Sequence, residues 1–95
     1  MDGKIKTAKQ LERHFKGIAN YHRIDILFLV SRNRGISVDK IAEALDCNFK
    51  TISEHTRRLV QAGLLNKNYQ GRTVVHTLSP YGEIITKFIT TFQHS

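Results

Sequence analysis

The chain has one cysteine, one proline and no tryptophan among its 95 residues. A single cysteine excludes an internal disulfide and is typical of proteins in a reducing compartment. No apolar run approaches the roughly 20 residues that a membrane-spanning helix needs, and no signal-peptide pattern is present at the start. We therefore expect a cytoplasmic protein without a membrane partner.

Acidic residues are also scarce. Asp and Glu total 8 against 15 Lys and Arg, which gives a formal net charge of +7. This balance favours a polyanionic partner, and nucleic acid before a membrane surface. The length predicts one domain over residues 1–95 with one modest core. The segment of residues 1–6 is short, polar and basic, and we expect it to be disordered.

The patterns of most enzymes are missing as well. No glycine-rich phosphate loop precedes a helix, and no paired carboxylates stand at catalytic spacing. Ser53 and His55 are two positions apart on an expected helix, so their side chains diverge and cannot form a nucleophile–base pair. We expect neither an enzyme nor a cofactor.

Metal ligands are few and scattered. Cys47 has no second cysteine and is expected to pack as a small buried hydrophobe. The histidines include no i, i+4 pair that would chelate zinc; the scattered ones are His14, His22, His76 and His94. We assign no metal site within one chain, while a site between the subunits of a dimer stays open.

The most informative stretch runs from Ile36 to Gly63 and predicts two short helices joined by a tight turn. The first follows Ser37 as N-cap. The second follows Asn48 as N-cap and ends at Gly63, where a left-handed residue stops a helix. Only residues 46–48 separate the two, and Asp46 tolerates the left-handed conformation. Helices joined so closely must cross, which defines a helix-turn-helix.

The outward face of the second helix has the composition of a DNA-reading surface. Hydroxyls and amides near its start suit base edges, while cations further along suit phosphates. This face comprises Lys50, Thr51, Glu54, Arg57, Arg58 and Gln61, with Ser53 and His55 at its flanks. The alternative is a solvated charged surface without a ligand.

Helical patterns precede this stretch, and a hairpin and a further helix follow it. A helix capped by Thr7 leads, after a break at 19–22, to an apolar helix from Arg23 to Ser31 that ends at Gly35 as C-cap. Residues 64–69 and 72–78 predict a hairpin with a basic tip, hence a wing. Ser79 and Pro80 start the last helix. The expected fold is α+β, mainly α, in the order α-α-α-α-β-β-α.

The first and last expected helices have apolar stripes that are wide for so small a domain. One interpretation is that they only cover the core. We favour a two-fold dimer interface, because contiguous exposed apolar patches mark contacts. The residues expected in this interface are Leu11, Phe15, Ile84, Ile85, Phe88, Ile89 and Phe92.

Four short motifs stand in a fixed order along the chain. They are HRIDIL at 22–27, SVDKIAEAL at 37–45, TISEH at 51–55 and LVQAGLL at 59–65. Their order and spacing resemble those of the ArsR-type winged helix-turn-helix transcription regulators from about residue 18 to residue 78. The resemblance implies a homodimer that binds a pseudo-palindromic operator in double-stranded DNA, one recognition helix (about 48–62) per half-site.

The resemblance also implies roles for individual residues. Base contacts would come from the first half of the recognition helix, at Asn48, Lys50, Thr51, Ser53 and His55. Phosphates would be bound by Arg57, Arg58, Lys67 and Arg72, the last two from the wing at about 64–78. The function implied is that of a transcription regulator, and in particular a repressor.

The chain departs from the family pattern at several positions. Metal-sensing members have a cysteine pair where this chain has Ser37 and Asp39. Others bind metal through Asp and His pairs on the last helices, where this chain offers only Glu83 and His94. Glu54 would repel phosphate unless it accepts a hydrogen bond from a cytosine amine. A metal- or ligand-responsive sensor, or a winged helix that contacts protein instead of DNA, therefore stays open.

Overall fold

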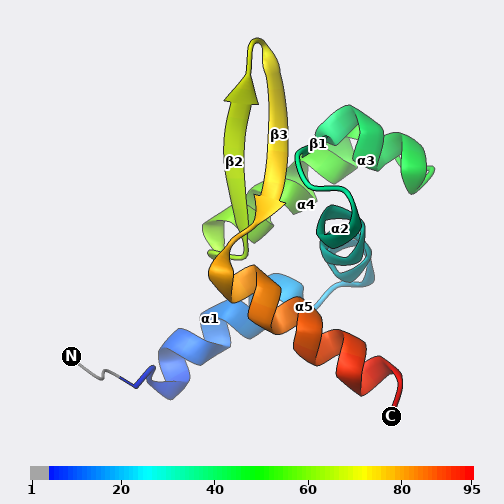
Figure 1. Ribbon diagram of the computed structural model, residues 1–95. Helices are drawn as coiled ribbons and strands as arrows, with labels where there is room; N and C mark the ends of the chain where they lie inside the picture. Colours follow the sequence, from blue (N-terminus) through cyan, green and yellow to red (C-terminus); the bar gives the residue numbers. More distant parts are fainter. Residues whose placement is uncertain (1–4) are drawn as a thin grey trace.

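The computed structural model describes residues 5–95, and it confirms the predicted winged helix-turn-helix order (Figure 1). Its elements are α1 (Ala8–Ile18), α2 (Tyr21–Arg32), β1 (Ile36–Ser37), α3 (Val38–Ala44), α4 (Phe49–Gln61), β2 (Leu65–Gln70), β3 (Thr73–Leu78) and α5 (Pro80–Gln93). Residues 1–4 of the segment expected to be disordered lie outside the described part. No helix in residues 5–95 is long and apolar enough to cross a membrane.

Three antiparallel strands form the sheet, in the order β1-β3-β2. β2 and β3 pair along their full length, from Leu65 opposite Leu78 to Gln70 opposite Thr73. The two-residue turn between them begins with Gly71 at φ 64°, a conformation that hairpin turns require and glycine adopts without strain. The hairpin projects away from the helices (Figure 1).

β1 was not expected from the sequence. Its two residues pair with the middle of β3, Ile36 opposite His76 and Ser37 opposite Val75. A strand of two residues has no alternation to detect, so no pattern signals it.

Two predicted boundaries of the second helix are wrong. Residues 21 and 22 belong to α2, because the Asn20 side-chain oxygen accepts hydrogen bonds from the backbone N–H groups of His22 and Arg23, at 2.9 and 3.3 Å. At the other end the C-cap is Asn33. Gly35, at φ 81°, instead turns the chain toward β1, and its N–H donates to the His76 carbonyl at 3.0 Å.

The core is centred on α2 and on the inward stripe of α4, which consists of Ile52, Thr56 and Leu59. Its fully buried side chains are Ile26, Leu27, Val30, Ile41, Ile52, Leu59 and Leu64. Each contributes about 1.5–3 kcal/mol through burial of apolar surface. Thr56 is buried in the same stripe of α4. Its hydroxyl donates to the Ser53 carbonyl at 2.9 Å, so this buried polar group has a hydrogen-bond partner.

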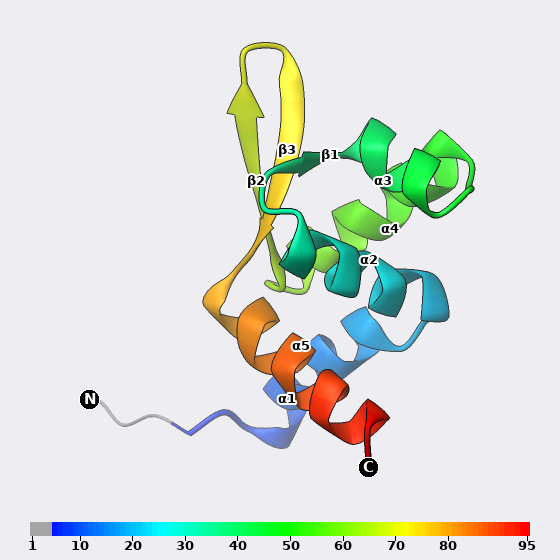
Figure 2. The same cartoon turned by 45° about the vertical axis from the view of Figure 1, so that its right-hand side comes forward.

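Helices α1 and α5 lie at the end of the molecule opposite the hairpin tip (Figure 1, Figure 2). One glycine in each of these helices allows close packing against residues that follow α4. A Cβ on Gly17 would lie 2.5 Å from the Ala62 Cβ, and one on Gly82 would lie 2.0 Å from the Leu64 carbonyl oxygen. Glycine at position 17 therefore lets α1 approach the end of α4.

Candidate nucleic-acid interface

The turn between α3 and α4 forms as predicted and sets the direction of α4. Asp46 has φ 49°, the left-handed conformation that lets so short a connection reverse the chain. The Asn48 side-chain oxygen accepts hydrogen bonds from the N–H groups of Lys50 at 2.7 Å and Thr51 at 3.3 Å. The cap uses this oxygen and leaves the amide nitrogen of Asn48 for an external acceptor.

Side chains from α4 and the hairpin meet at one groove. Its cavity volume is about 450 Å³, and its lining includes Ser53 and Arg57 of α4, Lys67 of β2 and Arg72 of the turn. Arg57, Lys67 and Arg72 are exposed. At the start of α4, Lys50 and Thr51 are exposed as well. Seven of the nine predicted DNA-binding residues thus lie on the start of α4 or around this groove: Asn48, Lys50, Thr51, Ser53, Arg57, Lys67 and Arg72.

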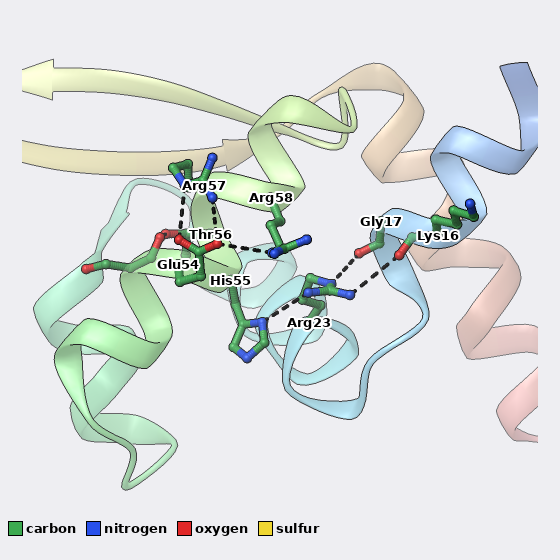
Figure 3. Close-up of polar contacts among 9 residues, drawn as sticks. Lys16, Gly17, Arg23, Glu54, His55, Thr56, Arg57 and Arg58 are labelled. Atoms are coloured by element: carbon green, nitrogen blue, oxygen red, sulfur yellow. Dashed lines mark hydrogen bonds and ion pairs between the residues drawn. The ribbon is translucent and has the colours of Figure 1, made fainter.

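Glu54 forms ion pairs with both neighbouring arginines (Figure 3). Its carboxylate accepts hydrogen bonds from Arg57 Nε at 3.1 Å and Arg57 Nη2 at 2.5 Å, and from Arg58 Nε at 3.1 Å. The Arg57 hydrogen bonds lower the pKa of Glu54, and the same bonds raise the pKa of Arg57. The three residues together have one net positive charge. Sequence reasoning treated Glu54 alone, although its i, i+3 and i, i+4 spacing to the arginines could have indicated the pairs.

Arg58 is directed away from the groove. It lines a second hollow, of about 290 Å³, with Arg13, Lys16 and Arg23. Figure 3 shows Arg57 on the side of α4 near the hairpin and Arg58 on the side near Arg23. The structure therefore separates these two predicted phosphate ligands.

His55 is directed toward α2 and does not join the groove. Its Nδ1 lies 3.2 Å from Arg23 Nη1, and its ring stacks on His22 with centroids 5.2 Å apart. Burial, and then the positive charge of Arg23, lower the pKa of His55. A neutral imidazole can accept a hydrogen bond from the guanidinium. His55 thus packs against α2 in the free protein, and its base contact stays a prediction.

Arg23, near the start of α2, links the end of α1 to the middle of α4. Its Nε donates to the Gly17 carbonyl at 2.6 Å, near the end of α1, where a cation is favoured by the helix dipole. Burial, and then the charge of Arg58, lower the pKa of Arg23. Arg23 and His55 belong to two different motifs of the sequence, and their contact joins α2 to α4.

Two exposed aromatic residues on α4 and the hairpin were not predicted as site residues. Phe49 is the first residue of α4 and is 53% exposed. An apolar side chain there can contact a thymine methyl group. Tyr69, on β2, is 68% exposed. Phe49 lies outside the inward stripe of α4, and this position in the sequence could have indicated that its ring is exposed on the predicted DNA-binding face.

An exposed apolar patch covers parts of α1 and α5. None of the residues of α1 is buried. Five of the seven residues predicted for the dimer interface are exposed, namely Leu11, Phe15, Ile84, Phe88 and Phe92. Ile85 and Ile89 are half-buried and pack against the core. The exposed part of the patch on α5 includes the stacked pair Phe88 and Phe92, with ring centroids 6.1 Å apart, and the interface itself stays a prediction.

Metal ligands are not clustered in the described structure. Within residues 5–95, no group of three or more His, Cys, Asp or Glu side chains could hold a metal ion. Cys47 packs against the core as expected, but it is half-buried and not fully buried.

Crossing helices α3 and α4 followed by a paired hairpin define a winged helix-turn-helix domain. The chain belongs to the HVO_A0114 family, whose model matches residues 18–86. No curated protein sequence matches the chain significantly.

Solved structures share this fold. A fragment of Mb0332 from Mycobacterium bovis, described as a homodimeric winged helix-turn-helix DNA-binding domain and a possible ArsR-family transcriptional regulator, has a TM-score of 0.84 at 22% identity, over 99% of this chain and 91% of that one. HlyU from Vibrio cholerae has a TM-score of 0.84 at 24% identity, over 97% and 100%. A predicted DNA-binding transcriptional regulator from E. coli has a TM-score of 0.77 at 20% identity, over 92% and 90%. The resemblance to ArsR-type regulators is thus confirmed in the fold.

Proposed function

We propose that this chain binds duplex DNA sequence-specifically as a homodimer and regulates transcription. The observation that carries the proposal is the groove at which Ser53 and Arg57 of α4 meet Lys67 and Arg72 of the hairpin. A major groove about 12 Å wide admits a helix. With α4 placed there, the hairpin reaches the neighbouring sugar–phosphate backbone.

The residue types divide between reading bases and binding phosphates. Thr51 and Ser53 have hydroxyls, and Asn48 a free amide nitrogen, at the start of α4, where base edges are reached. Lys50 lies beside them, and Phe49 offers a surface for a thymine methyl. Arg57, Lys67 and Arg72 neutralise phosphates, while Arg58 contributes only if it turns away from Arg23.

The patch on α1 and α5 supports the homodimer. Burial of its exposed rings against a second copy removes apolar surface from water. A two-fold axis would place the two copies of α4 about 34–36 Å apart, one turn of DNA. The homodimeric state described for Mb0332 supports the same assembly. Repression is the favoured action, because occupancy of a site alone excludes other proteins from it.

The test is DNA affinity across a salt series. Duplexes are first selected from a random pool, and binding is then followed by fluorescence anisotropy. Each lost phosphate contact should reduce the slope of log K against log salt by about 0.9. We expect the double variant Arg57→Ala, Arg72→Ala to lose about two contacts per subunit. The matched control Lys9→Ala, Lys87→Ala removes the same charge from α1 and α5 and should keep the parent slope.

Equal slopes for both double variants would overturn the assigned phosphate contacts. Selection should enrich symmetric sites if the dimer is correct. A pool with no enriched sequence would overturn sequence-specific binding. Enrichment of one half-site without symmetry would overturn the dimer.

A further inference from the structure

The groove between α4 and the hairpin has apolar walls that phosphate binding does not use. Val38, Phe49, Val60 and Val74 line it. Its volume of about 450 Å³ lies within the range of roughly 300–1,000 Å³ that is typical of small-molecule sites. A phosphate group is far smaller and has no apolar surface to place against these valines.

A buried histidine lines the same groove. His76 is 2% exposed, and its Nδ1 has no hydrogen-bond partner within the described residues. Buried polar atoms without partners are rare and call for an explanation. Burial, and then the charge of Lys67, lower the pKa of His76. The imidazole is therefore neutral near pH 7, and no bond to Nδ1 fixes its tautomer, so the ring can either donate or accept.

Three cations, Arg57, Lys67 and Arg72, also line the groove, against the single carboxylate of Asp39. Lys67 lies directly across the sheet from His76. The charge thus favours an anionic ligand group, while the valines favour an apolar body.

We propose that this groove is a binding site for a small organic carboxylate with an apolar body. The body packs against Val60 and Val74, the carboxylate pairs with Lys67 and its neighbouring cations, and His76 hydrogen-bonds to a polar group of the ligand. The regulatory consequence rests on the proposed function. Because Arg57, Lys67 and Arg72 are also the proposed phosphate ligands, the carboxylate and DNA exclude each other.

Ligand binding is tested first on the full chain without DNA. Amide chemical shifts are recorded during titration with naphthalene-2-carboxylate, and separately with its neutral amide, 2-naphthamide. We expect shifts at Val60, Val74 and His76, and tighter binding of the carboxylate. Lys67→Gln should weaken the carboxylate about two- to fivefold, as expected for a partly exposed ion pair, and leave the amide unchanged.

A matched pair of tryptophan variants tests the location. Val74→Trp fills the groove and should weaken the carboxylate at least about tenfold. Asn68→Trp places the same ring on the opposite face of the hairpin and should bind as the parent does. Circular dichroism establishes whether both are folded; should Val74→Trp not fold, Lys67→Gln carries the test. Shifts elsewhere, equal binding of carboxylate and amide, or no shifts up to about 10 mM would overturn the site.

A second titration tests the coupling to DNA. With a selected duplex already bound, the carboxylate should displace it and the amide should not. If both bind at once, the coupling is wrong. If the duplex does not bind even without the carboxylate, the proposed function fails, whereas the shifts in the DNA-free protein still decide the site.

Discussion

Replacement of Glu54 by glutamine should strengthen DNA binding. In the free protein, the Glu54 carboxylate holds Arg57 through two hydrogen bonds and Arg58 through one. Both arginines are therefore partly neutralised before they meet a phosphate. Glu54→Gln removes one negative charge per subunit and frees Arg57 on the groove side of α4.

The magnitude follows from counterion release. Glu54→Gln raises the net charge of Glu54, Arg57 and Arg58 together from one to two positive charges. This is equivalent to one more neutralised phosphate and steepens the slope of log K against log salt by about 0.9. If parent and variant bind equally at 1 M salt, the variant then binds roughly eightfold tighter per subunit at 0.1 M salt. Fluorescence anisotropy from about 0.05 to 0.3 M salt measures this slope. The fold should change little, because exposed ion pairs contribute weakly to stability.

Glu12→Gln is the matched control. Glu12 pairs with Lys16 at 3.4 Å in the same exposed helical arrangement, but on α1. Its removal adds the same charge, and at 0.1 M salt a charge more than about 10 Å away is largely screened. If Glu54→Gln bound no tighter than Glu12→Gln and had the same slope, the Glu54 carboxylate would not offset phosphate binding by Arg57 and Arg58.

Three further changes test the fold, the dimer and the buried histidine. Gly82→Ala should lower the unfolding free energy by about 1–3 kcal/mol, because its Cβ would lie 2.0 Å from the Leu64 carbonyl oxygen; at about 4–8 °C per kcal/mol the melting temperature reports it. Phe88→Glu should dissociate the dimer in sedimentation equilibrium, since each buried Phe contributes about 1.5–3 kcal/mol, whereas Lys87→Glu should not. The pKa of His76 is lowered from 6.5 by burial, so the unfolded chain takes up the proton first and stability falls as pH drops below about 6.5. His76→Phe should make chemical denaturation less dependent on pH.

For each of these three predictions, one outcome would contradict the stated reason. An unchanged melting temperature for Gly82→Ala would mean that α5 can shift away from Leu64 without cost. A Phe88→Glu protein that still sediments as a dimer would place the interface elsewhere. A His76→Phe protein with the parent's pH dependence would show that other groups, such as His55, dominate the loss of stability in acid.

Local chemistry made much of the fold predictable. The caps at Ser37, Asn48 and Ser79 form as expected, because each side chain accepts a hydrogen bond from a backbone N–H only two or three residues further along. The left-handed residue at Asp46 follows from the same short-range logic. The helix-turn-helix and the hairpin therefore could be derived from residue order alone.

Contacts between distant residues could not be derived in this way. Arg23 and His55 are 32 positions apart, and no spacing rule joins them. The burial of His76 depends on how β3 packs against β1, β2 and the neighbouring helices, so its sequence neighbours, which alternate as in any strand, gave no sign of an unpaired nitrogen. Likewise, the opposite directions of Arg57 and Arg58 depend on how α4 packs against both α2 and the hairpin.

The central claim is that α4 and the hairpin together form the DNA-binding face. The most direct measurement is amide chemical-shift mapping of the full chain during titration with a selected duplex. The largest shift changes should fall within residues 50–58 and 67–72. The residues of α5 outside the proposed dimer interface should not shift. A duplex that binds while both of those segments stay unchanged would contradict the claim.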